Sequence, residues 1–263
     1  MRTAFTYPFT KRWLFVVAVV FVIFMNYLSN ALPFGGMTNA QISAAYPTLI
    51  TPAGYAFSIW GIIYLTLAVF AFFQLRKGKE VRLYRLIWPY FMVNVLANSF
   101  WLVAFQNEWF VVSVAVMAVL LGTLIGMFRI FYRLRRALST THRYFFHVPF
   151  GIYFAWVSVA SIVNVAVALV ALDVSFFIGA EELWAAVMLV TGFGIAVFFL
   201  VTRKDYIYAL TFVWAYTAIM FAHMDVDLVR YPAKFGAIGL LVVSASLFIA
   251  DRIKVAQYGR SNS

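Results

Sequence analysis

Long apolar runs dominate this sequence and constrain its fold more than any other feature. Of its 263 residues, 65% are hydrophobic and only 11% are charged, whereas water-soluble domains contain roughly 45–50% apolar residues. The runs approach the length of about 20 residues that a membrane-spanning helix needs, and they lack the short alternating segments of β-barrel strands. We therefore predict an all-α, polytopic transmembrane bundle with about eight spans, which begin near Trp13, Tyr55, Ile87, Trp109, Pro149, Leu183, Tyr206 and Lys234.

The charged residues are distributed unevenly along the chain, whose formal net charge is +11. When successive loops are assigned to alternate sides of a membrane, all Lys and Arg residues except Arg230 and Lys234 fall on one side. This asymmetry follows the positive-inside rule for an even number of spans. It predicts a multi-pass protein of the cell (plasma) membrane with both termini in the cytoplasm. The basic loops would meet lipid headgroups, so the expected partner is the lipid bilayer and not nucleic acid.

Groups that carry acid–base, nucleophilic or metal chemistry are scarce. The chain has no cysteine, which excludes disulfides and thiolate chemistry. The predicted spans hold essentially no Asp, Glu, Lys, Arg or His away from their ends, whereas enzymes and ion-coupled transporters place such groups inside. His142 and His147 are five positions apart and do not share a helical face. We therefore expect no enzyme activity, no catalytic or metal-binding residue and no required cofactor.

Local signals predict where several helices begin and end. Lys11 and Arg12 precede an apolar core, as in a signal peptide, but the apolar run is long for one, so we expect the first helix to be retained. We expect the third helix to follow Pro89 and the fifth to begin at Pro149, because proline is favoured in the first helical turn. Residues 252–263 are expected to form a short, basic, polar tail.

The longest loop on the predicted outer side, residues 33–54, contains no charged residue. It mixes turn-forming residues with apolar ones, whereas a loop that stays in water ordinarily carries charges. We interpret it as a lid that folds over the mouth of the bundle, with a short amphipathic segment capped by Thr38 or Asn39. The alternative is a plain connector.

Amide and glycine residues in two other spans predict helix packing. Asn26 and Asn30 lie one turn apart near the outer end of the first helix, where they either face the bundle or meet water at the membrane interface. Gly122 and Gly126 form a GxxxG pattern in the fourth helix. Such a face suits close packing within the chain or a homodimer of two chains.

Three predicted helices carry stripes of aromatic and amide side chains. Residues three, four or seven positions apart lie on one helical face, and such stripes occur at Phe57, Trp60 and Tyr64, at Asn94, Asn98, Trp101 and Phe105, and at Tyr153, Trp156, Ala160 and Asn164. A pocket of this composition suits a flat, apolar molecule with a few polar edges. The alternative is that these residues are packing anchors and interfacial aromatics, which periodicity alone favours.

Three motifs in these stripes resemble those of the TspO/MBR family, the tryptophan-rich sensory or translocator proteins. TPAGYAFSIWGIIY (Thr51–Tyr64) resembles the start of the family's second helix, and NSFWLVAF (Asn98–Phe105) resembles its third. The pattern Tyr-x-x-Trp-x-x-x-Ala-x-x-x-Asn from Tyr153 to Asn164 resembles its fifth. The resemblance implies a five-helix core at residues 1–172, with the lid-like loop at 33–54. Three additional transmembrane helices and the tail then occupy residues 173–263.

The resemblance also implies a pocket that is closed by the first loop and binds porphyrins or other lipophilic molecules. The family's cholesterol pattern is missing from Leu169–Gly179, which lacks both Tyr and a basic residue. The expected function is to bind a lipophilic, tetrapyrrole-like small molecule for sensing or transport. The alternatives are a transporter or permease of another substrate and a structural or accessory membrane subunit. The ligand-binding residues implied by the motifs are Phe57, Trp60, Tyr64, Asn98, Trp101, Phe105, Tyr153, Trp156, Ala160 and Asn164.

Overall fold

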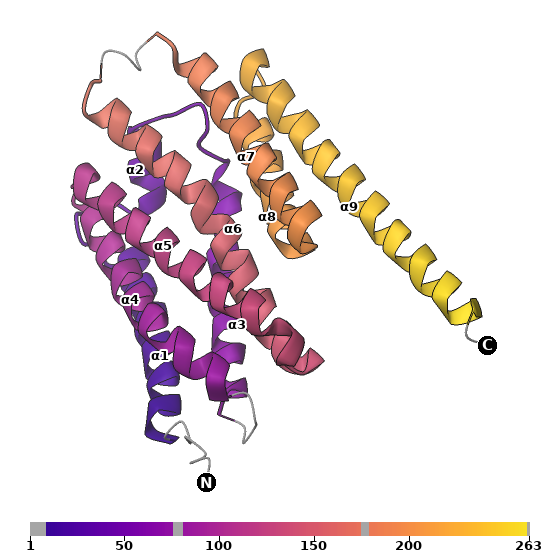
Figure 1. Cartoon of the computed structure of the whole chain (residues 1–263). Coiled ribbons are helices and arrows are strands. Elements are labelled where there is room, and N and C mark those ends of the chain that lie inside the picture. Colours follow the sequence, from indigo (N-terminus) through magenta and orange to yellow (C-terminus); the bar gives the residue numbers. More distant parts are fainter. Residues whose placement is uncertain (1–8, 76–80, 175–178, 262–263) are drawn as a thin grey trace. The chain divides into compact units, whose positions relative to one another are not determined.

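The computed structural model describes residues 9–75, 81–174 and 179–261, and this part of the chain is built of helices (Figure 1). Within these described ranges, seven helices are long and apolar enough to cross a membrane, and the 17-residue α8 is apolar but shorter. The predicted all-α membrane bundle is therefore confirmed. The helices are α1 (Phe9–Ala31), α2 (Asn39–Ala45), α3 (Ile59–Phe73), α4 (Val81–Gln106), α5 (Phe110–Leu134), α6 (Thr140–Ala171), α7 (Glu181–Arg203), α8 (Tyr206–Ala222) and α9 (Asp227–Ser261).

The described chain forms two compact units, and the first contains residues up to Pro47 together with Phe57–Val174. Five long helices of this unit close a ring, because α1 contacts α3, α3 contacts α6, α6 contacts α5, α5 contacts α4 and α4 contacts α1. One end of the ring is filled with phenylalanine rings. The ring centroids of Phe15 and Phe91 are 4.9 Å apart, and those of Phe70 and Phe150 are also 4.9 Å apart. All four side chains are 0–1% exposed. These four residues belong to α1, α4, α3 and α6, so this core packs together the three helices that carry the predicted stripes, α3, α4 and α6, and α1.

The second unit contains the segment Thr48–Ala56 and the helices α7, α8 and α9, which all contact one another. Tyr216 of α8 lies at their centre, and its hydroxyl donates a hydrogen bond to the carbonyl of Leu189 in α7. A methyl group added at Gly192 or at Gly236 would come within 2.7 Å or 2.6 Å of Tyr216. Glycines at these two positions therefore let α7 and α9 approach the Tyr216 ring closely.

Three helices continue through a proline, and for Pro89 and Pro149 this is contrary to the expectation that the proline lies in the first turn. Pro89, Pro149 and Pro232 lie inside α4, α6 and α9, which begin at Val81, Thr140 and Asp227. Each proline removes one backbone hydrogen bond, but such an interruption is tolerated in membrane helices, where neighbouring groups re-satisfy the freed backbone. Residues 252–261 of the predicted basic, polar tail continue α9, which extends to Ser261.

The predicted short helix in the first loop is present as α2. Thr38 is its N-cap, and a capping box joins the side chains of Thr38 and Gln41 to each other's backbone N–H groups. Ile42 anchors α2, since this side chain is 0% exposed. The loop contributes to both units, because Pro33–Pro47 belongs to the first and Thr48–Ala56 to the second.

Candidate ligand-binding site

The ring of helices brings aromatic side chains of α3 and α4 into one ladder of nearly parallel rings. Trp60 stacks on Tyr64 with centroids 5.6 Å apart and on Trp101 at 6.5 Å. Trp101 in turn stacks on Phe105 at 5.2 Å. We call Tyr64, Trp60, Trp101 and Phe105 the aromatic ladder. It is built of flat aromatic rings from two helices.

The third stripe, on α6, closes the aromatic ladder edge-on. Tyr153 meets Trp60 at 5.9 Å between centroids with the rings inclined by 65°, and Trp156 meets Phe57 at 6.1 Å and 87°. Edge-to-face and offset-stacked pairs are the arrangements that aromatic rings prefer. Ala160 lies on the same α6 stripe between Trp156 and Asn164 and is half-buried.

Two chains of hydrogen bonds connect the helices around the aromatic ladder. In one, Asn26 of α1 donates to Asn98 of α4 at 3.2 Å, and Asn98 donates to the hydroxyl of Tyr153 at 2.9 Å. In the other, the indole N–H of Trp101 donates to Asn164 at 2.7 Å, and Asn164 donates to Ser113 of α5 at 2.9 Å. All five helices of the ring thus contribute: α3 through its rings, α4 and α6 through rings and polar groups, and α1 and α5 through polar groups.

One hydrogen-bond donor of the cluster takes part in neither chain of hydrogen bonds. The indole N–H of Trp156 is buried, has no hydrogen-bond partner among the described residues, and belongs to a side chain that is 2% exposed. Buried polar groups without a partner are rare in folded proteins. The Tyr64 hydroxyl is also buried and meets no partner at hydrogen-bonding geometry, although the amides of Asn26 and Asn98 lie near it. The cluster therefore carries one free donor, and a hydroxyl without a well-aligned partner, beside its flat apolar faces.

The exposure of the predicted residues differs between the helices. Asn98, Trp101, Phe105, Tyr153, Trp156 and Asn164 are all buried, whereas Phe57, Trp60, Tyr64 and Ala160 are half-buried. The accessible surface of the cluster is thus mostly on α3. A molecule that reaches the cluster would meet the α3 rings first.

The sequence analysis missed two residues that fix the loop beside the cluster. The side chain of Gln106 is 1% exposed, donates to the carbonyl of Ser29 at 2.8 Å and accepts from the N–H of Phe34 at 2.9 Å. Gly35 lies so close that a methyl group added there would come within 1.7 Å of the Gln106 carbonyl oxygen. A glutamine at the end of an apolar span belongs to no periodic pattern, so the sequence does not predict its role in fixing the loop.

The far end of α2 is fixed through Tyr46. Its ring meets Phe110 edge-on at 4.9 Å, and its hydroxyl donates to the Glu108 carboxylate at 2.8 Å. This hydrogen bond to the anion raises the pKa of the Tyr46 hydroxyl above its usual value near 10, with smaller contributions from desolvation and from the charge of Glu108. Residues 34–46 are therefore attached at both ends to the ends of α4 and α5.

Apart from Asn26, the remaining features lie away from the cluster. Asn26 faces the bundle, as the first of the two predicted alternatives has it. Asn30 is exposed, as the second alternative has it. Gly126 faces Tyr90 of α4, but Gly122 is exposed with open space around it. An apolar groove of about 210 Å³ contains none of the predicted ligand-binding residues and is lined by Thr66, Val69, Tyr144, Phe145, Val148 and Pro149.

Comparison with known proteins identifies one family. A model of the family described as TSPO-like protein matches residues 12–246 of the chain. The match begins in α1 and ends in α9, so it includes the helices that the three motifs did not reach. No curated protein and no solved structure matches the chain.

Proposed function

The chain belongs to the TSPO-like protein family, and we propose that it binds a flat, lipophilic small molecule, tetrapyrrole-like in shape, at the aromatic ladder. The bound molecule would serve sensing or transport. This function needs no catalytic residue, metal ion or resident cofactor, in keeping with the scarcity of reactive groups in the spans. The fold alone does not determine the function, so the proposal depends on the residues of the site.

The aromatic ladder supports this proposal through its shape and composition. Tyr64, Trp60, Trp101 and Phe105 offer successive flat faces, and the half-buried α3 rings keep part of that surface accessible. Small-molecule sites are mostly apolar and aromatic, with a few polar groups that orient the ligand. A planar macrocycle with polar edges matches this combination better than a flexible or highly charged molecule.

The observation that carries the proposal is the unpartnered indole N–H of Trp156. An indole nitrogen is a donor only, so its partner in a ligand would be an acceptor such as a carboxylate or carbonyl oxygen. Leaving a buried donor unsatisfied costs roughly 1–3 kcal/mol, and a ligand that accepts from it would recover part of that cost. The proposed ligand therefore carries an acceptor at the edge of its ring system.

The test is a titration of the purified protein with protoporphyrin IX, followed by quenching of tryptophan fluorescence. Trp156→Phe keeps an aromatic ring but removes the N–H, and it should weaken binding by about 2- to 10-fold, as expected for loss of one hydrogen bond. Trp109→Phe is the matched control, because Trp109 is half exposed and outside the ladder. Unchanged affinity in the double variant Trp156→Ala and Asn164→Ala would remove the assignment of the site.

A second candidate, a structural or accessory membrane subunit, is favoured by the direct contacts among the rings. Trp60 touches Tyr64, Trp101 and Tyr153 without an intervening group. Rings that only hold helices together would show no quenching by protoporphyrin. The same titration therefore separates the two functions, and ion-gradient-driven uptake by proteoliposomes would instead indicate a transporter of another substrate.

We also propose that the protein resides in the plasma membrane with both termini in the cytoplasm. The support is the position of the basic residues, because all Lys and Arg except Arg230 and Lys234 fall on one predicted side. Cytoplasmic loops carry such an excess in membrane proteins generally.

A further inference from the structure

We propose that the first turns of α9 bind the phosphate of an anionic phospholipid, with Arg230 and Lys234 as the cations. The site lies within the second compact unit, and none of its residues belongs to the aromatic ladder. It is one face of α9 that we call the α9 strip, and its members are Arg230, Tyr231, Lys234, Phe235, Ile238 and Val242. The inference gives the last helix a function of its own at the membrane surface.

One face of α9 is packed and the other is open. Val229, Ala233 and Leu240 are 0% exposed, and α9 contacts both α7 and α8. Members of the α9 strip follow one another in steps of three or four residues, so they share the opposite face of the helix. Tyr231 and Phe235 on this face are 43% and 62% exposed. The α9 strip is therefore open to the medium around the unit, which for a membrane helix is lipid.

The positions of the charges along α9 agree with a site at the lipid headgroups. Arg230 and Arg252 are separated by 22 positions of one helix, which is about 33 Å at about 1.5 Å per residue and close to the ~30 Å of the hydrocarbon core. No charged residue lies between Lys234 and Asp251. Helical side chains lean toward the N-terminus of their helix, and a lysine keeps its ammonium group at the membrane surface. Lys234 therefore extends toward Arg230.

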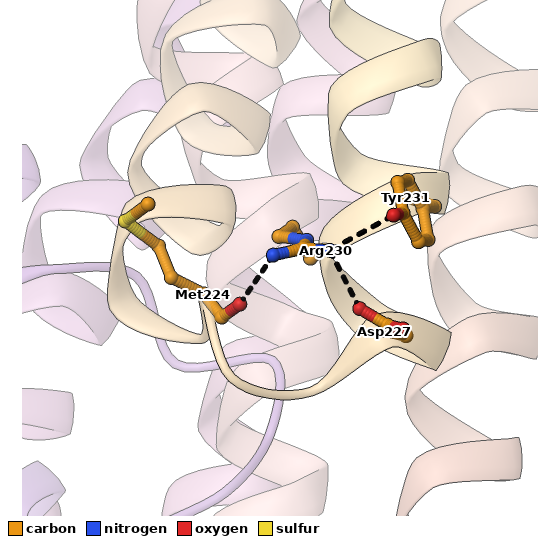
Figure 2. A network of polar contacts seen from close by, with 4 residues as sticks. All are labelled: Met224, Asp227, Arg230 and Tyr231. Carbon is orange, nitrogen blue, oxygen red and sulfur yellow. Dashed lines mark hydrogen bonds and ion pairs between the residues drawn. The ribbon is translucent and has the colours of Figure 1, made fainter.

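Arg230 is held in place and still has donors for a further acceptor (Figure 2). One terminal nitrogen donates to the carbonyl of Met224 at 2.9 Å, and the other donates to Asp227 at 2.7 Å and to the hydroxyl of Tyr231 at 2.9 Å. These bonds use three of the five N–H groups of a guanidinium, and the described residues provide no acceptor for the other two. The side chain is 31% exposed. A phosphate can therefore bind a guanidinium that is already oriented.

Lys234 supplies the second cation. It is exposed, forms no ion pair with any described residue, and lies four positions from Arg230, where side chains of a helix are neighbours. Asp227 compensates the charge of only one of the two cations, so this end of α9 keeps a positive charge. Arg230 and Lys234 are also the two basic residues on the predicted outer side. Charge complementarity therefore favours an anion at this position.

The apolar members of the α9 strip match the rest of a phospholipid. The rings of Tyr231 and Phe235 stack with centroids 6.1 Å apart and 17° between their planes. Ile238 and Val242 follow along the helix and are 46% and 57% exposed. An acyl chain can lie along these four side chains while its phosphate meets the two cations. A headgroup without an ammonium group fits best, because its negative charge is not already compensated.

Contact quenching by nitroxide-labelled lipids tests the site locally. The chain has no cysteine, so Ile238→Cys can carry a single bimane fluorophore in vesicles of mixed phosphatidylcholine and phosphatidylglycerol. Either lipid then carries the nitroxide on its acyl chain. We expect phosphatidylglycerol to associate at this position about 3- to 10-fold more strongly than phosphatidylcholine, as for one or two basic residues at a charged lipid surface. Added salt should lower this preference.

Two substitutions should change the preference in opposite directions. Lys234→Gln removes one cation and should lower the preference for phosphatidylglycerol. Asp227→Asn removes the carboxylate that shares Arg230 with the lipid, and it should raise the preference. A damaged fold would not produce both results. Lys204→Gln is the matched control, because Lys204 pairs with Asp251 beyond the uncharged stretch of α9 and should leave the preference unchanged.

A label at Leu65→Cys, an exposed position of α3, reports the lipids around the protein in general. Equal association of the two lipids at Ile238, or the same preference at Leu65, overturns the proposal. An unchanged preference in Lys234→Gln also overturns it. Weak quenching by both lipids at Ile238 would mean that another protein surface, such as a second copy of the chain, covers the α9 strip, and the proposal would again be wrong. Binding of protoporphyrin is measured separately, so these results leave the proposed function untouched.

Discussion

The indole N–H of Trp101 donates a 2.7 Å hydrogen bond to the side-chain oxygen of Asn164, and both residues are buried. The bond joins α4 to α6 across the ring of helices. It orients the central ring of the aromatic ladder, and Asn164 passes the connection on to Ser113 of α5. This pair links the packing of three helices to the shape of the proposed site.

Asn164→Ala should destabilise the protein by roughly 1–3 kcal/mol, because it leaves the buried indole N–H of Trp101 without an acceptor. Trp101→Phe removes the same bond from the other side. The two substitutions should therefore be non-additive in thermal unfolding of the detergent-solubilised protein. Additive losses would mean that the hydrogen bond contributes nothing beyond the packing of each side chain.

Gly35→Ala should disturb the attachment of the first loop, because the added methyl group would come within 1.7 Å of the Gln106 carbonyl oxygen. Backbone atoms must shift to relieve such a contact, and we expect a lower unfolding temperature and faster proteolysis between residues 33 and 47. Gly61→Ala is the matched control, since nothing lies within 4 Å of its added methyl group. Equal behaviour of the two variants would contradict the close approach.

Tyr46 should titrate above its usual value near 10, because its hydroxyl donates to the Glu108 carboxylate. A pKa raised in the folded state means that the contact contributes stability below pH 10 and loses it as the pH rises through the raised value. A spectrophotometric titration, taken as the difference between the unmodified protein and Tyr46→Phe, measures this pKa. In Glu108→Gln the same difference should titrate at lower pH, and an unshifted titration would contradict the hydrogen bond.

Gly122→Leu tests self-association at the GxxxG face. Gly126 already faces Tyr90 within the chain, whereas Gly122 is exposed with open space around it. If two copies associate through α5, a leucine at Gly122 should shift the mass of the purified protein from dimer to monomer in light scattering. Identical masses for Gly122→Leu and the unmodified protein would contradict a dimer through this face.

Single cysteines test the topology, and the absence of natural cysteine provides a clean background. Asp225→Cys and Arg136→Cys place a thiol at exposed positions on the two predicted sides. A membrane-impermeant maleimide added to intact cells should label the first and label the second only after permeabilisation. The reverse pattern would place the termini outside.

The three stripes could be read from the sequence because helical periodicity is local: a residue and its neighbours at three, four and seven positions share a face whatever surrounds the helix. The same applies to the Thr38 cap, which satisfies donors within its own first turn. The boundaries near Pro89 and Pro149 could not be predicted in this way. The proline preference for first turns is a statistical rule, and the membrane bundle overrides it.

The amino-acid sequence alone indicates a membrane protein of apolar helices, because composition and run length decide which solvent a chain can enter. It also determined which face of each helix carries rings and amides. The contact partners of these side chains depend on the fold, since Trp101 and Asn164 are 63 positions apart and Ala56 and Trp214 are 158 apart. Helical periodicity carries no information over such separations, because it is the packing of whole helices that brings these residues into contact.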